Sequence, residues 1–139
     1  MPRFGFDHIH LRSPDPEATA RWYEQMLGAE ILRSMQDGKP RIDLVLGGQK
    51  IFIAQADASV AAPPDAPYQG LDHFGLVVEG LDEVVAELKA KGVRFTLDPM
   101  QPRPGIRIAF LRGPENVSIE LLERSPRSEE RRVGKECRS

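Results

Sequence analysis

Hydrophobic and polar residues follow first the period of a strand and then the period of a helix, and this order occurs twice along the chain. Residues 4–10 alternate with a period of two, which predicts a strand that carries His8 and His10 on one face. Asp15 then suits the N-cap of a helix, in which apolar residues at helical spacing continue until Gly28. The opening segment is therefore predicted to be a strand followed by an amphipathic helix.

Three more strands are predicted after this helix, and the whole order then repeats. In the first half, these strands are expected at residues 30–35, 41–46 and 50–55. In the second half, a strand is expected at 71–78, a helix at 81–91, and strands at 93–97, 106–111 and 117–122. Two copies of one βαβββ order predict an α+β fold of two modules, because a doubly wound parallel sheet needs strands and helices that alternate throughout.

Composition divides the chain into four parts. The modules are expected at residues 1–57 and 71–126, joined at 58–70 by a linker rich in alanine and proline, which cannot continue a helix or a ladder. Residues 127–139 hold one apolar residue and follow no period, so they are predicted to be a disordered tail. Their sequence is similar to translated cloning vector, which favours a vector-derived origin over a basic interaction arm.

The repeat brings metal-binding residue types to equivalent positions. His8 and His73 occupy the same place in the two modules, and matching the last strands pairs Phe52 with Glu120. If both sheets line one cavity, His8, His73 and Glu120 form a set of two imidazoles and one carboxylate. This set suits Fe(II), Mn(II) or Zn(II) and leaves coordination positions open for water or substrate.

His10 shares the predicted face of His8 and has several possible roles. It suits a substitute ligand, a hydrogen-bond donor to a ligand or a contact to substrate, and a packed histidine fits equally well. A single histidine on a strand is more commonly a hydrogen-bonded side chain than a ligand, so the metal hypothesis depends on the repeat.

Charge and composition narrow the class of partner. The chain has 139 residues, a net charge of −2 and no basic stripe with interleaved aromatics, so a small molecule is expected as partner rather than nucleic acid. No apolar run approaches the ~20 residues needed to cross a bilayer, and the start lacks a signal-peptide core. The one cysteine, Cys137, cannot form an internal disulfide, which predicts a cytoplasmic protein.

Four segments resemble a known family. They are residues 7–12 (DHIHLR), 22–28 (WYEQMLG), 71–76 (LDHFGL) and 119–123 (IELLE). Together they resemble the vicinal oxygen chelate superfamily, which includes glyoxalase I, methylmalonyl-CoA epimerase, extradiol dioxygenases and antibiotic-resistance proteins. The resemblance covers nearly all of the chain up to Glu123.

The resemblance implies two modules that form a U-shaped, half-open barrel of mixed sheet around a metal cavity, usually within a homodimer. It implies His8, His73 and Glu120 as ligands of Fe, Mn, Zn, Ni or Co, with Fe or Zn favoured. Phe52 departs from the pattern, because glyoxalase I and the epimerase carry a fourth ligand there, so Phe52 is expected to contact substrate. Arg12 matches a glyoxalase arginine that meets a substrate carboxylate, although a surface residue at a strand end is an equal alternative.

Three functions are compatible with these residues. The leading hypothesis is a glyoxalase- or epimerase-like lyase or isomerase, in which a divalent ion chelates two vicinal oxygens of a small substrate and Glu120, helped by His10, moves a proton. The missing fourth ligand favours an Fe(II) extradiol-type dioxygenase as the second hypothesis. The third is a metal-free resistance protein that sequesters a drug-like ligand.

Overall fold

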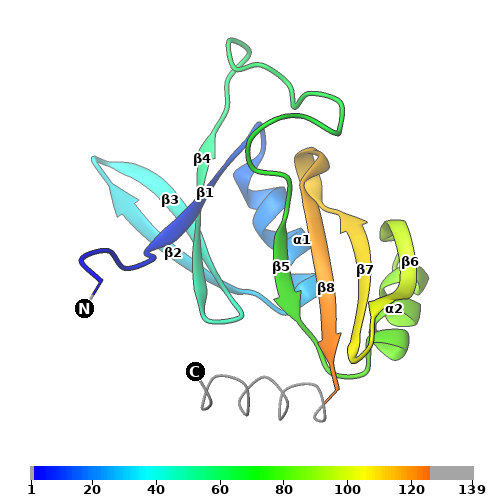
Figure 1. Cartoon of the computed structure of the whole chain (residues 1–139). Coiled ribbons are helices and arrows are strands. Elements are labelled where there is room, and N and C mark those ends of the chain that lie inside the picture. The colour runs from blue at the N-terminus through cyan, green and yellow to red at the C-terminus, as the bar shows by residue number, and fades with distance from the viewer. Residues whose placement is uncertain (1, 126–139) are drawn as a thin grey trace. The chain divides into compact units, whose positions relative to one another are not determined.

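The computed structural model describes residues 2–125 and contains two units, whose boundary lies between Pro64 and Asp65. Each unit is one four-stranded sheet with one helix packed on it (Figure 1). The first contains β1 (His8–Ser13), α1 (Pro16–Leu27), β2 (Glu30–Gln36), β3 (Lys39–Leu46) and β4 (Gln49–Gln55). The second contains β5 (Phe74–Val77), α2 (Leu81–Ala90), β6 (Arg94–Arg103), β7 (Ile106–Arg112), a short 3₁₀ turn (Pro114–Asn116) and β8 (Ser118–Arg124).

Both sheets have the same strand order. It is β1-β4-β3-β2 in the first module and β5-β8-β7-β6 in the second, with the first and last strands of each module parallel and the other pairs antiparallel. The predicted α+β fold of two βαβββ modules is therefore confirmed, and the U-shaped arrangement of the two sheets remains a prediction. The predicted tail, residues 127–139, lies outside the described residues, as does Pro126.

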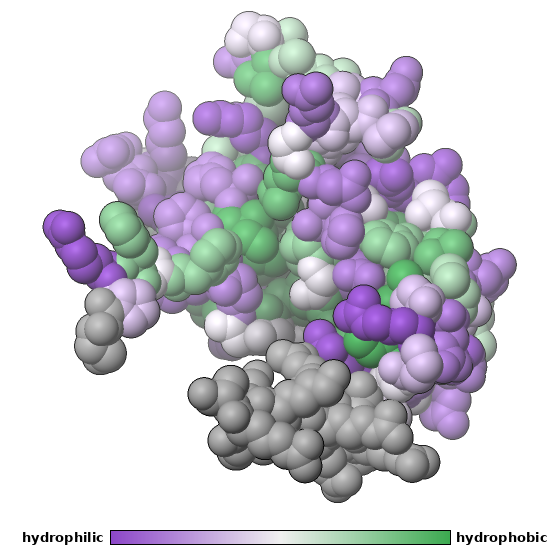
Figure 2. Space-filling model, viewed as in Figure 1, coloured by the Kyte–Doolittle hydropathy of each residue, from purple (hydrophilic) through white to green (hydrophobic). Residues whose placement is uncertain are grey.

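Each sheet buries the face that its helix covers. On this face lie the apolar residues of the central strands, such as Leu44 and Ile51 in the first module and Leu111 and Ile119 in the second, none of them more than 1% exposed. Hydrophilic side chains cover much of the surface visible in Figure 2, with smaller hydrophobic areas between them. One face of each sheet thus supplies the core, and the other face is available for chemistry.

Three strands differ markedly from the predicted ranges, of which β6 ends at Arg103 rather than at residue 97. The first begins at His8 rather than at residue 4, because its parallel partner β4 begins only at Gln49 and gives the preceding residues no ladder. Phe4 and Phe6 are consequently 89% and 76% exposed. β5 begins at Phe74, so His73 lies just before the strand rather than within it.

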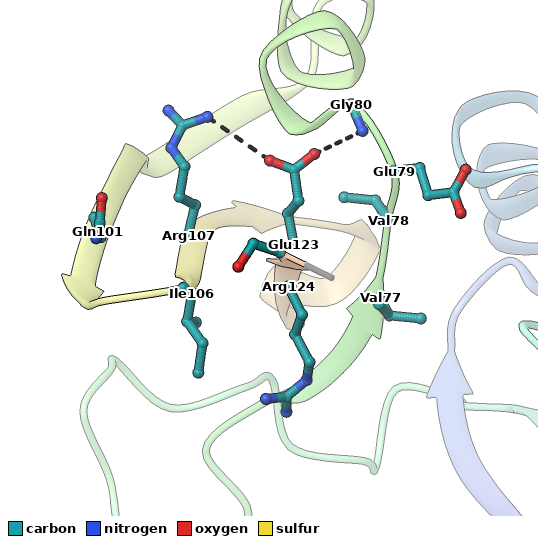
Figure 3. A pocket seen from close by; sticks show the side chains of 11 residues that line it. Val77, Val78, Glu79, Gly80, Gln101, Ile106, Arg107, Glu123 and Arg124 are labelled. Atoms are coloured by element: carbon teal, nitrogen blue, oxygen red, sulfur yellow. Dashed lines mark hydrogen bonds and ion pairs between the residues drawn. The ribbon is translucent and has the colours of Figure 1, made fainter. Parts of the chain in front are cut away.

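The two helices are capped in different ways. Asp15 accepts a hydrogen bond from the Ala18 amide at 3.1 Å, which confirms the predicted N-cap of α1. At the start of α2, Gly80 has no side chain to cap the helix. Instead Glu123 of β8 accepts hydrogen bonds from the amides of Gly80 and Leu81 at 2.7 and 3.0 Å (Figure 3). None of the described helices has the length and apolarity required to span a bilayer.

This cross-strand cap gives a first prediction. Glu123→Ala should lower the free energy of unfolding by about 1 to 3 kcal/mol, because two amides at a helix end lose a charged acceptor. Glu79→Ala is the matched control, since Glu79 is exposed and directed away from Glu123 in Figure 3. Urea denaturation measures both changes, and equal stabilities of the two variants would contradict the capping role.

Candidate functional site

In the second module, His73 lies between two carboxylates. Its Nδ1 is 2.7 Å from Asp72 Oδ2, and its Nε2 is 3.3 Å from Glu120 Oε1. The Glu120 side chain is 18% exposed and that of His73 is 30% exposed, so both are sheltered but reachable. A carboxylate only accepts hydrogen bonds, so His73 donates from Nδ1 to Asp72. Its other ring nitrogen, Nε2, is the one that faces Glu120.

A glycine makes room for Glu120. Gly75 is the residue opposite Glu120 in the parallel β5–β8 pair. A Cβ atom at Gly75 would lie 3.3 Å from Glu120 Oε1, closer than most side chains tolerate. The absence of a side chain there allows the carboxylate to lie over β5, beside His73.

The first module repeats half of this arrangement. His8 Nδ1 is 2.7 Å from Asp7 Oδ2, the same distance as in the second module. This hydrogen bond lowers the pKa of the Asp7 carboxyl below its usual value. Asp7 and Asp72 are functional candidates that the sequence analysis did not single out, although an aspartate directly before each repeated histidine was the available signal.

An aromatic ring lies where the second module has its glutamate. Phe52 is opposite His10 in the β1–β4 pair, just as Glu120 is opposite Gly75 in the β5–β8 pair, so the two positions are equivalent. The Phe52 ring stacks on His8, with centroids 4.1 Å apart and planes 25° from parallel. Phe52 therefore supplies an aromatic wall beside His8 and no ligand atom.

His10 and Arg12 extend the same exposed face of β1. The rings of His10 and Phe52 meet edge to face with centroids 6.2 Å apart, so His10 packs beside Phe52 without a hydrogen bond among the described residues. Arg12 is opposite the small Ala54 and is exposed. Both residues border the face that carries His8, which is compatible with a contact to substrate.

The donor atoms of the second module suit a divalent cation. Two ligand atoms that each lie about 2.0 to 2.2 Å from a tetrahedral ion are separated by about 3.3 to 3.6 Å. His73 Nε2 and Glu120 Oε1 are 3.3 Å apart. The described residues 2–125, however, contain no group of three His, Cys, Asp or Glu side chains that could hold a metal ion.

A pocket lies at the end of the second sheet. It has a volume of about 660 Å³, and its lining includes Gly80, Arg107, Glu123 and Arg124 (Figure 3). Glu123 is already satisfied by the α2 amides, and Arg107 makes a two-point ion pair with Asp82, which lowers the pKa of that carboxyl. These side chains are engaged in stabilising the fold, so the pocket is a weaker candidate than the histidine sites.

Comparison with known proteins identifies the family. Residues 7–110 match the family described as the glyoxalase/bleomycin resistance protein/dioxygenase superfamily. The chain belongs to this superfamily, also called the vicinal oxygen chelate superfamily. The family that the sequence resembles is therefore confirmed.

Individual relatives are distant and include named enzymes. The chain is 27% identical to a probable chloroplastic lactoylglutathione lyase of Arabidopsis thaliana, over 88% of this chain and 36% of that protein. It is 26% identical to a probable lactoylglutathione lyase of Vibrio cholerae, over 84% of this chain and 88% of that protein. The chain thus spans about a third of the plant relative but most of the bacterial one.

A solved structure confirms the fold. A glyoxylase/bleomycin resistance protein/dioxygenase domain from a Frankia species superposes with a TM-score of 0.71 at 28% identity, covering 90% of this chain and 95% of that chain. Distant homologues of the chain are thus named lyases, and the fold is that of the superfamily.

Proposed function

We propose that this protein is a metal-dependent, glyoxalase- or epimerase-like enzyme that acts on a small substrate bound through two vicinal oxygens. The observation that carries the proposal is the pairing of His73 Nε2 with Glu120 Oε1 at 3.3 Å, with Nδ1 held by Asp72. His8 has an equivalent aspartate partner, Asp7, and is proposed as the third ligand. The lyases among the distant homologues support this class of reaction.

Different residues of the chain would have different roles in the reaction. A divalent ion, with Fe or Zn favoured among Fe, Mn, Zn, Ni and Co, would polarise a carbonyl or enediol oxygen of the substrate. Asp7 and Asp72 keep each imidazole in the tautomer whose Nε2 is free to bind. Glu120 is the carboxylate best placed to accept and return a substrate proton, since Gly75 leaves it space to move.

The remaining expectations belong to the same proposal. His10 and Phe52 would border the substrate beside His8, because their rings lie on the same exposed face. We propose a homodimer, since the open sheet faces and edge strands of this fold need to be covered. We also propose a cytoplasmic location, since the single cysteine excludes an internal disulfide.

The ligand set predicts a clear pattern of metal loss. His8→Ala, His73→Ala and Glu120→Ala should each remove most of the bound metal, because two remaining ligands hold a divalent ion weakly. His10→Ala is the matched control and should retain it. Elemental analysis after reconstitution measures the metal content, and wild-type content in any of the first three variants would overturn its assignment as a ligand.

Loss of either aspartate is predicted to weaken metal binding without abolishing it. Asp7→Ala and Asp72→Ala should each weaken metal binding about 10- to 100-fold, because the histidine loses the hydrogen bond that orients its ring. Asp65→Ala, which changes an exposed residue before the second module, is the control and should leave the affinity unchanged. Competition with a chromogenic chelator gives the affinities, and equal values for all three variants would contradict the orienting role.

The absence of a fourth ligand favours one alternative reaction. Phe52 carries no ligand atom, and a set of two histidines and one glutamate is also the set of Fe(II) oxygenases. A lyase or isomerase should turn over equally in air and under anaerobic conditions, whereas a dioxygenase should lose all activity without O₂. Oxygen consumption during turnover of a catechol by the Fe(II)-loaded protein would establish the alternative, and its absence with anaerobic turnover of a 2-oxoaldehyde adduct would exclude it.

A further inference from the structure

Rows of side chains that cross the exposed faces of the two sheets show where the modules differ. In the first module, one row contains His10, Phe52, Asp43 and Leu32, and in the second the equivalent row contains Gly75, Glu120, Phe110 and Leu97. The carboxylate and the aromatic ring have thus exchanged strands. Asp43 stands where the second module has Phe110, and Phe52 stands where it has Glu120.

The next row differs more strongly. In the first module it contains Arg12, Ala54, Arg41 and Ser34, because Arg41 lies two residues before Asp43 and Ala54 two residues after Phe52 on antiparallel strands. In the second module it contains Val77, Leu122, Ile108 and Met100. One module therefore presents two guanidinium groups beside a small alanine, whereas the other presents only apolar side chains.

Arg41 is held on three sides. Its Nε is 2.8 Å from Asp43 Oδ2, and its Nη1 is 2.9 Å from Gln36 Oε1. Its guanidinium lies over the Phe52 ring, 4.6 Å from the centroid. Asp43 is 14% exposed, whereas Arg41 is 32% exposed. These contacts fix the plane of the guanidinium, and among the described residues Nη2 has no hydrogen-bond partner.

Phe52 connects Arg41 to the candidate metal site. The same ring stacks on His8 at 4.1 Å, so the guanidinium and the His8 ring are separated by no more than these two centroid distances together. A small molecule can span that length. Arg41 and Ser34 also line a pocket of about 560 Å³, which is within the range of small-molecule sites.

Both guanidinium groups that line this pocket are paired with a carboxylate. Arg33, which also lines the pocket, is neutralised by Glu17 through two hydrogen bonds, and these lower the pKa of Glu17 to about 2. Arg41 is paired with Asp43, and Asp15 also lines the pocket, whereas Arg12 does not line it and has no ion pair among the described residues. The charge in this row that has no ion-pair partner is therefore that of Arg12, and Arg41 contributes the free Nη2 donor of a guanidinium in a fixed plane.

We propose that Arg41 is the anion-recognition residue of this protein, and that the substrate is a small molecule with a carboxylate at the end opposite its two vicinal oxygens. This inference rests on the proposed function for the position of the oxygens, but not for the anion site itself. Arg41 binds the carboxylate through Nη2 and the outer edge of the guanidinium, and Ala54 leaves the space that the carboxylate occupies.

The test uses the full chain after complete removal of metal, so that it reads the anion site alone. Propionate is titrated against propionamide, its neutral isostere, at constant ionic strength, and binding is followed by the amide NMR signals of Ser34 and Ala54. Propionate should bind saturably and propionamide should not. Arg41→Gln should weaken propionate binding about tenfold or more, since a charged hydrogen-bonding partner is lost.

Two further variants separate recognition from general charge. Arg41→Lys should also weaken binding several-fold, because lysine keeps the charge but loses the planar pair of donors. Arg103→Gln removes one positive charge from the exposed end of β6 in the second module and should bind propionate like the wild type. Circular dichroism checks that each variant is folded, and amide spectra check that the sheet is unchanged.

Each outcome decides one hypothesis. Equal binding by the wild type and Arg41→Gln, or equal binding of propionate and propionamide, would overturn the anion site even if the protein holds metal. Binding that depends on Arg41 in a protein that holds no metal after reconstitution would support the anion site and remove the proposed metal-dependent reaction. Arg41→Gln should retain the wild-type metal content, because Arg41 provides no ligand.

Discussion

The parallel pairing of the first and last strand of each module is the constraint on which the site depends. In a βαβββ unit, this pairing places residues from the start of the unit directly beside residues from its end, such as Gly75 beside Glu120. The helix between them covers one face and supplies the buried core, so the chemistry is confined to the other face. Because the unit occurs twice, this juxtaposition also occurs twice, once beside each of the two histidines.

The two copies have kept one feature and changed another. Both retain an aspartate that binds Nδ1 of the following histidine at 2.7 Å, which fixes the orientation of each imidazole. The last strands have diverged, because Glu120 provides a carboxylate and Phe52 provides a ring that stacks on His8. One copy therefore has a carboxylate beside its histidine, and the other has a ring that stacks on its histidine and contacts Arg41.

The same divergence explains why the two exposed faces have different chemical characters. Arg41 and Arg12 belong to a row whose counterpart in the second module is entirely apolar, although both rows occupy equivalent positions of the same sheet. A duplicated fold can vary these positions freely, since side chains on the open face do not contribute to the core under the helix. The side chains on the open face of one module can thus differ from those of the other without changing either sheet.

The sequence by itself determined the fold class and the repeat. Periods of two and of 3.6, with Asp15 and Gly28 as helix boundaries, depend on residues near one another in the chain. They predicted every helix and strand, although β1 begins four residues later and β6 ends six residues later than predicted. The observed strand ends differed from the predicted ones where pairing with another strand sets the end. β1 begins at His8 because β4 offers no earlier partner, and no local pattern records where a distant strand begins.

Only the tertiary structure decided which side chains meet. The contact of His73 with Glu120, the cap that Glu123 gives to α2 and the support of Arg41 by Phe52 each join residues that are brought together by strand order and register. The repeat could indicate that His8, His73 and Glu120 are candidate site residues, because equivalent positions of the two modules can be recognised from the sequence alone. It could not indicate Arg41, whose importance comes from a neighbour across the sheet rather than from its place in a motif.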